Sequence, residues 1–165
     1  MNDFIDKNFF WRKKNINKSV DFKKINTFID KINCKIIHNG NFSFYVKPSP
    51  EGSFPNHISG DYIRMPSYQQ FYSFNEYYFN LFHEISHWSE IRLNLNLDEF
   101  KSELVAEIVS NLLCNKFQIQ ISNQKNCDIY LNKWINEVSL NENYIKDSYE
   151  IALKIVKKLN GFQRN

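Results

Sequence analysis

Two histidines four positions apart, with a glutamate directly after the first, are the residues of this sequence best suited to chemistry. They are His83, Glu84 and His87 in the stretch FNLFHEISHWSEIRLN. On an α-helix of about 3.6 residues per turn, both imidazoles lie on one face and can bind one metal ion. Glu84 is rotated by about 100° from His83, so its carboxylate can reach a water molecule beside the ion. The HExxH spacing therefore predicts Zn²⁺ at the two histidines and Glu84 as the general base of a hydrolase.

The simpler alternative is a buried helix whose histidines only hydrogen-bond to neighbouring groups. Apolar side chains cover the other faces of this segment, which places the helix in the interior of the protein. Two imidazoles and a carboxylate need partners there, and a metal ion supplies them. The apolar residues in question are Tyr77, Tyr78, Leu81, Phe82, Ile85 and Trp88.

A catalytic zinc ion needs a third protein ligand and one open coordination position. Residues 99–117 show apolar side chains at helical spacing, and Glu103 and Glu107 lie together at the edge of that apolar stripe. We expect Glu103 to be the third ligand and Glu107 to lie behind it, where it can accept a histidine N–H. The alternative is that both glutamates are solvated surface carboxylates.

Three other carboxylates compete for the third ligand position. Asp98 and Glu99 lie in the loop or first turn before Glu103. Glu90 follows the second histidine by three residues, too far along the same helix to complete a tetrahedron. Beyond the metal ligands, we consider His57 and Tyr62 as groups that could contact an oxyanion or the substrate. The sequence does not choose between these two.

The helix that carries the histidines has a recognisable start. Ser73 is followed three positions later by Glu76, the spacing of a capping box. Tyr72 and Tyr77 have the spacing of a hydrophobic staple across that start. We expect the helix to run from about residue 75 to about residue 88 and a loop to follow it.

The remaining elements predict an α+β fold with a small antiparallel sheet packed on the active-site helix. Apolar spacing predicts a helix over residues 20–32, and Asn39-Gly40 favours a tight hairpin between two β-type runs. Residues 61–66 alternate and stop at a proline, typical of an edge strand. Two more helices are expected at residues 128–139 and 141–161, with Gly161 at the end of the second.

Length and composition indicate one globular domain. The chain has 165 residues, and we expect a basic N-terminal arm over residues 1–19 and the folded domain over residues 20–161. The net charge of +3 is too small to indicate nucleic-acid binding by itself. Three scattered cysteines suit a reducing compartment. With no apolar run of signal-peptide or membrane-span length, we expect a cytoplasmic protein.

The match to a known family extends beyond the HExxH motif. The segments GDYIRMPSYQQFYSFNEYYFNLFHEISHWSE, SELVAEIVSNLLC and YLNKWINEV resemble, in this order, the zincin-like metallopeptidase domain of ArdC-type antirestriction proteins. Related domains occur in conjugation-linked primases and in polyvalent proteins of phages and plasmids. The resemblance covers residues 20–158. It implies a cytosolic zincin fold, zinc at His83, His87 and Glu103, Glu84 as catalytic base, and a gene on a mobile genetic element.

Three departures from the family pattern limit what the resemblance implies. The family often has two adjacent glutamates before LVAE, and here the first is Ser102. The glycine that usually follows HW[ST] is Glu90 here. ArdC-type proteins also carry a further N-terminal domain that binds single-stranded DNA, for which this chain has no room. Antirestriction through DNA binding is therefore not part of the expectation.

Taken together, these observations predict a zinc metallopeptidase that acts on a protein or peptide substrate. One alternative is a catalytically silent binding module for a host protein or single-stranded nucleic acid. The basic arm and its aromatic residues motivate that alternative, because aromatic side chains on a basic strip suit single strands. Another is a peptidase dedicated to one regulator, like the ImmA/IrrE type that cleaves a repressor.

Overall fold

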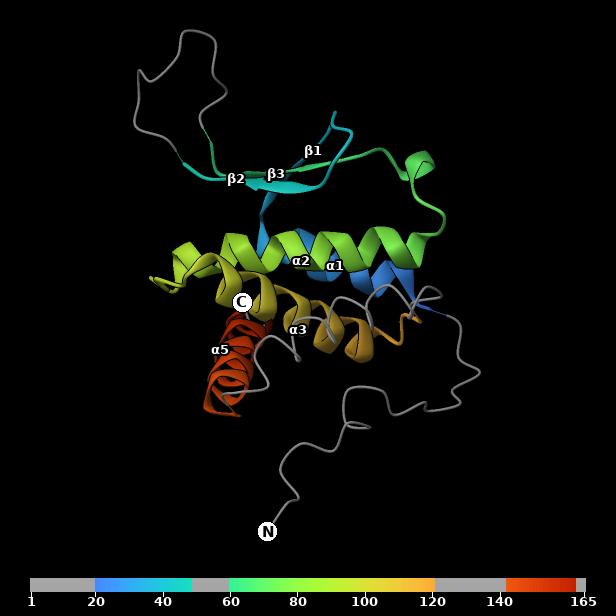
Figure 1. Ribbon diagram of the computed structural model, residues 1–165. Coiled ribbons are helices and arrows are strands. Elements are labelled where there is room, and N and C mark those ends of the chain that lie inside the picture. Colours follow the sequence, from blue (N-terminus) through green and yellow to red (C-terminus); the bar gives the residue numbers. More distant parts are fainter. Residues whose placement is uncertain (1–19, 49–59, 121–141, 163–165) are drawn as a thin grey trace, which may run out of the picture.

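The computed structural model describes residues 20–48, 60–120 and 142–162 (Figure 1). The N-terminal arm, the loop that contains His57 and the helix expected at residues 128–139 lie outside the described residues. The described elements are α1 (Phe22–Ile32), β1 (Lys35–His38), β2 (Phe44–Val46), β3 (Tyr62–Met65), the 3-10 helix η1 (Tyr68–Gln70), α2 (Phe74–Arg92), α3 (Glu99–Phe117) and α5 (Glu142–Gly161).

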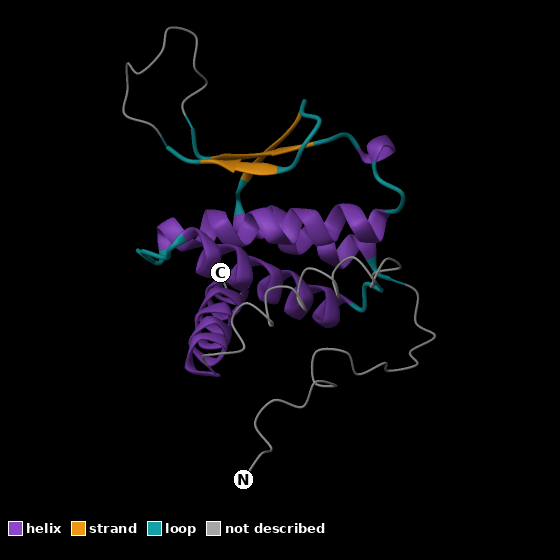
Figure 2. Ribbon diagram, viewed as in Figure 1, coloured by secondary structure: helices purple, strands orange, loops and turns teal. Residues whose placement is uncertain are grey.

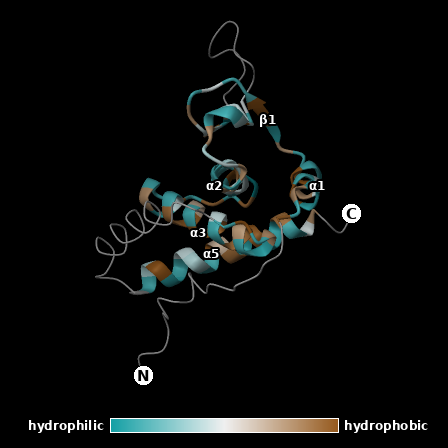
Figure 3. Cartoon of the chain, turned by 90° about the vertical axis from the view of Figure 1, so that its right-hand side faces the viewer, coloured by the Kyte–Doolittle hydropathy of each residue, from teal (hydrophilic) through white to brown (hydrophobic). Residues whose placement is uncertain are grey.

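Helix α2 lies at the centre of the fold. The sheet lies over one side of α2 and α3 packs against the other side, with α1 beside it and α5 against α3 (Figures 2 and 3). This mostly helical arrangement with one small sheet confirms the expected α+β class. No helix in the described ranges combines the length and apolarity that a bilayer span requires.

The sheet is mixed rather than antiparallel, which corrects the sequence-based expectation. Its strand order is β1-β3-β2, with β1 parallel to β3 and β2 antiparallel to β3. The hairpin expected at Asn39-Gly40 therefore does not form, because β3 lies between the two strands that it would have joined. For the same reason the strand in residues 61–66 is central and not an edge. The edges of the described sheet are β1 and β2.

The start of α2 is capped much as the sequence predicts. The Ser73 hydroxyl oxygen accepts the Glu76 backbone N–H at 3.2 Å. The Glu76 carboxylate accepts the backbone N–H of Tyr72, at 2.8 Å, instead of that of Ser73. The expected staple is wrong, because Tyr72 is 93% exposed while Tyr77 is buried. The helix also continues to Arg92, four residues beyond the expected end.

One hydrophobic core joins the sheet and all four described helices. Apolar side chains of α2 that face away from the histidines fill its middle, and α3 and α5 close it from below. This core fixes the position of α2 between the sheet and α3. The position of the helix in turn determines where its polar side chains reach the surface. The largest fully buried side chains are Tyr77, Phe82, Ile25, Ile63, Met65, Leu81, Ile85, Leu113, Ile155, Leu159, Val105 and Val109.

A polar cluster ties the C-terminal end of α2 to the sheet. Arg92 donates through Nη2 to both carboxylate oxygens of Asp61, at 2.8 and 2.6 Å. The Tyr45 hydroxyl on β2 donates to the same carboxylate at 2.8 Å. The Arg92 guanidinium also lies 3.4 Å from the centroid of the Trp88 ring and donates to the Trp88 carbonyl. These contacts fix strand β2 relative to the helix below it.

We therefore expect Arg92→Ala to lower the free energy of unfolding by about 1–2 kcal/mol. It removes charge-assisted hydrogen bonds from a partly exposed cluster, whose contribution solvent reduces. Urea unfolding of the metal-free protein measures the change. The control is Lys24→Ala, which removes an exposed ion pair to Asp21 and should leave the midpoint unchanged. Equal effects of the two substitutions would contradict a specific role for the cluster.

Candidate metal centre

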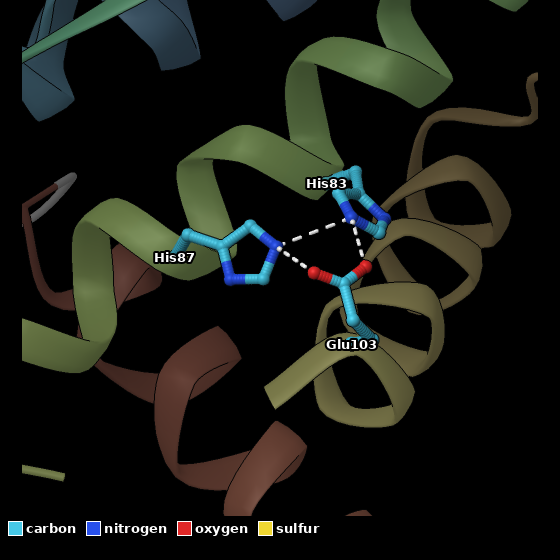
Figure 4. Close-up of side chains that lie close together, drawn as sticks. All are labelled: His83, His87 and Glu103. Carbon is cyan, nitrogen blue, oxygen red and sulfur yellow. Dashed lines mark hydrogen bonds and ion pairs between the residues drawn. The ribbon is translucent and has the colours of Figure 1, made fainter. Parts of the chain in front are cut away.

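The two histidines of α2 present their Nε2 atoms to one point in space. These atoms lie 3.2 Å apart, and the rings stand one helical turn from each other (Figure 4). Glu103 on α3 approaches the same point from the neighbouring helix. Its Oε2 lies 3.2 Å from Nε2 of His83, and its Oε1 lies 3.4 Å from Nε2 of His87. Among the described residues, this is the group of three side chains close enough to hold one metal ion.

These distances suit tetrahedral coordination. Zinc binds imidazole nitrogen and carboxylate oxygen at about 2.0–2.2 Å, so two ligand atoms of one tetrahedron lie about 3.3 Å apart. The two Nε2 atoms lie 3.2 Å apart, and each lies 3.2 to 3.4 Å from a different oxygen of Glu103, which is close to that edge length. Glu103 is 42% exposed, which leaves the solvent side of the site open for a fourth ligand.

The outer nitrogen of each imidazole faces a carboxylate. Nδ1 of His83 lies 3.4 Å from Oε2 of Glu107, and Nδ1 of His87 lies 3.2 Å from Oε1 of Glu90. A carboxylate accepts a hydrogen bond from a protonated ring nitrogen, so these contacts favour the tautomer of each ring with its hydrogen on Nδ1. Each Nε2 atom then presents a lone pair, and two lone pairs 3.2 Å apart require a proton or a cation between them.

The electrostatics of the site agree with this requirement. Burial alone would lower the pKa of His83, but its hydrogen bonds to Glu103 and Glu107 raise that pKa to about 10. Burial also disfavours the charged form of His87, while Glu103 and Glu90 raise its pKa to about 9. Hydrogen bonds from the two histidines hold the pKa of Glu103 well below its usual range. The carboxylates thus favour positive charge at the centre, which protons and a divalent cation can each supply.

Glu84 lies on a different face of α2 from the two histidines. Its residue is 7% exposed, and it is directed toward β2, where the backbone N–H of Tyr45 donates to its carboxylate. Burial raises the pKa of Glu84, while the nearby histidines and the Tyr45 N–H act in the opposite direction. A carboxylate with a raised pKa accepts a proton more readily, as a general base must.

The structure separates the remaining candidates by their contacts. Glu107 lies behind His83, as expected, and not in the ligand group. Asp98 caps α3 by accepting the backbone N–H of Lys101, and Glu99 lies in the first turn of that helix. Tyr62 alternates with Ile63 on β3, so it faces away from the core side of the sheet and does not join the site. His57 lies outside the described residues.

Sequence reasoning missed two groups that contact the site. Ser102 lies 3.1 Å from Nδ1 of His87 and also bonds to Glu90, which the sequence suggested only as a competing ligand. The spacing of three between His87 and Glu90 is the signal that could have indicated this contact. The Tyr45 N–H carries no side-chain signal at all, because any residue except proline supplies it.

A helix that carries HExxH, a carboxylate from the following helix and a sheet edge beside the glutamate together define a zincin-like metallopeptidase fold. The sequence matches the family model described as a zincin-like metallopeptidase over residues 23–148. The chain therefore belongs to this family. No functionally curated protein matches it.

Two solved structures of the antirestriction protein ArdC from plasmid R388 are similar to this chain. The Mn(II)-bound structure aligns with a TM-score of 0.62 at 24% identity, covering 89% of this chain and 54% of that one. The metal-free structure aligns with a TM-score of 0.61 at 24% identity, covering 89% and 52%. The chain thus spans about half the length of the ArdC chains that it matches. At this identity the likeness concerns the fold.

We expect His83→Ala to abolish stoichiometric zinc binding, because it removes one of three converging ligand atoms. Elemental analysis after dialysis against Zn²⁺ should find about one zinc per wild-type chain and close to none in the variant.

His38→Ala is the matched control. His38 bonds to the Tyr77 hydroxyl at the end of β1, away from the metal ligands, and its loss should leave the zinc content unchanged. Equal zinc in wild type and His83→Ala would rule out the assigned site.

Proposed function

We propose that this protein is a zinc-dependent metallopeptidase that hydrolyses peptide bonds with water. The observation that supports it best is the position of Glu84. This buried carboxylate lies on the face of α2 next to the group His83, His87 and Glu103, whose ligand atoms lie within 4.8 Å of one another. A metal site with only a structural role does not need a carboxylate held in this way.

Zinc is the metal that we propose for His83, His87 and Glu103. Two imidazoles and one carboxylate with an open position form a ligand set of catalytic zinc sites. When bound, the ion would act as a Lewis acid and lower the pKa of a water molecule toward about 7. The similar ArdC structure is a Mn(II)-bound one, so Mn²⁺ is the second ion to test.

Glu84 would take the proton of the attacking water and then deliver it to the leaving amine. The Tyr45 N–H and the fixed helix hold its carboxylate in place for both transfers. Glu107 and Glu90 would keep His83 and His87 in the tautomer whose Nε2 faces the metal. Each of these groups is already in position before a substrate arrives, which reduces the reorganisation that the reaction needs.

The substrate would be an extended peptide that pairs with β2. The sequence predicts residues 61–66 as an edge strand, which could pair with a peptide, but both sides of β3 are already paired. Strand β2 is an edge of the described sheet, and its Tyr45 is the residue that contacts Glu84. A peptide added along that edge would pass beside the general base.

We further propose that the enzyme acts in the cytoplasm and is encoded by a mobile genetic element. Membership in the zincin-like family and the ArdC-like fold support this setting. Its target would be a protein of the host or of the mobile element. In one form of this proposal, the target is a single regulatory protein, as for peptidases of the ImmA/IrrE type.

We expect Glu84→Gln to keep the metal and to lower peptide hydrolysis by at least about 100-fold, because it removes the proton acceptor and preserves side-chain shape. Cleavage of a quenched-fluorescent peptide library by zinc-loaded protein measures the change. Glu99→Gln, an exposed carboxylate at the start of α3, is the charge-matched control and should cleave normally.

The same assay separates peptidase from binding module. Wild-type rates in Glu84→Gln would show that the assigned base is wrong. A different outcome would favour the binding module. In that case, zinc-loaded wild type would cleave no peptide but would bind a single-stranded oligonucleotide, and salt or deletion of residues 1–18 would abolish that binding.

A further inference from the structure

We propose that Glu90 and Ser102 form a positioning pair that fixes His87 and Glu103 in metal-binding geometry. The inference rests on the metal site of the proposed function and goes beyond it, because neither residue is a ligand or the base. Both residues lie next to ligands, one on each of the two helices that build the site.

Three polar groups meet behind His87. The Ser102 hydroxyl lies 2.9 Å from each carboxylate oxygen of Glu90. Nδ1 of His87 lies 3.2 Å from Oε1 of Glu90 and 3.1 Å from the Ser102 hydroxyl oxygen. The side chain of Glu90 is 13% exposed, so these contacts are shielded from competing water.

The hydrogens in this cluster have one consistent assignment. With Nε2 of His87 directed to the ion, Nδ1 carries the proton and donates to Glu90 and Ser102. The Ser102 hydroxyl accepts from the ring and donates its own proton to the Glu90 carboxylate. Every polar atom is satisfied, and the chain of donors runs from ring to hydroxyl to carboxylate. Both contacts are made by Nδ1, so the ring cannot rotate without breaking both of them.

The pair also acts on the third ligand through the backbone. Ser102 directly precedes Glu103, so the contact between Ser102 and Glu90 fixes the turn of α3 that presents Glu103. The contact spans α2 and α3 independently of a metal ion. It would therefore preset the spacing between the histidines and the carboxylate before the ion binds, which lowers the cost of assembling the site.

Zinc affinity of the full-length chain, measured by competition with a chromophoric chelator, tests the proposal. Ser102→Ala and Glu90→Ala should each weaken zinc binding about 10- to 100-fold. The double variant should lose little more than one single variant, because both residues act through one contact. Ser102→Thr keeps the hydroxyl and should restore affinity to within a few-fold of wild type.

Urea unfolding with chelator present provides the second measurement. If the pair is a positioning device, losses in zinc affinity should exceed any change in metal-free stability. Ser89→Ala is the matched control. Ser89 directly precedes Glu90, but its hydroxyl donates within α2 to the Ile85 carbonyl and not to the site. It should keep zinc affinity whatever its effect on folding.

The outcomes separate this inference from the function on which it rests. Wild-type zinc affinity in Ser102→Ala and Glu90→Ala, or losses that add fully in the double variant, would overturn the pair while leaving the metal site intact. A wild-type chain that binds no zinc would overturn the proposed function itself and the pair with it. Failure of Ser102→Thr to restore affinity would also count against the hydroxyl contact.

Discussion

The convergence of two imidazole nitrogens and one carboxylate between α2 and α3 is the constraint on which the molecule depends. The three side chains favour positive charge at one point, and they come from helices that only tertiary packing brings together. An apolar helix buried on several sides must expose its polar residues along narrow strips. The core beneath the sheet and above α5 therefore does more than stabilise the fold. It sets the rotation and height of α2, and with them the directions of its histidines and glutamates.

Helix α2 divides its chemistry between two faces. Toward α3 it presents the histidines, and toward β2 it presents Glu84, so that ligands and base approach one region from adjacent directions. The Arg92–Asp61–Tyr45 cluster holds β2 against this helix from the far end. The site is thus built from three pieces of the fold, and each of its polar groups has an identified partner in the neighbouring element.

The sequence could predict which residues of the site come together, because the information for this part is local. HExxH on a helix decides where His83, Glu84 and His87 lie relative to one another, and the SELVAE segment placed Glu103 and Glu107 on the facing helix. The pairing of the strands was harder to predict from the sequence. Asn39-Gly40 is a local turn signal, whereas pairing of β1 with β3 joins strands separated by more than twenty residues and overrides it. From its position along α2, Glu90 is expected to lie too far from the ion to be a ligand. The i,i+3 spacing could have indicated its contact with the other ring nitrogen, but the contact of Ser102 with Glu90 crosses the helix interface, which no spacing within one helix reveals.

Because Tyr45 holds Glu84 through its main chain, the identity of its side chain is not what the base requires. Any residue but proline at position 45 would supply the same N–H donor, whereas the Tyr45 side chain serves the contact with Asp61 that holds β2 in place. A shift of β2 by a single position along β3 would turn that N–H away from Glu84, because successive N–H groups of a strand point in opposite directions. Selection at this strand should therefore preserve its length and alignment more strictly than its composition, and insertions beside it would be far more harmful than point replacements within it.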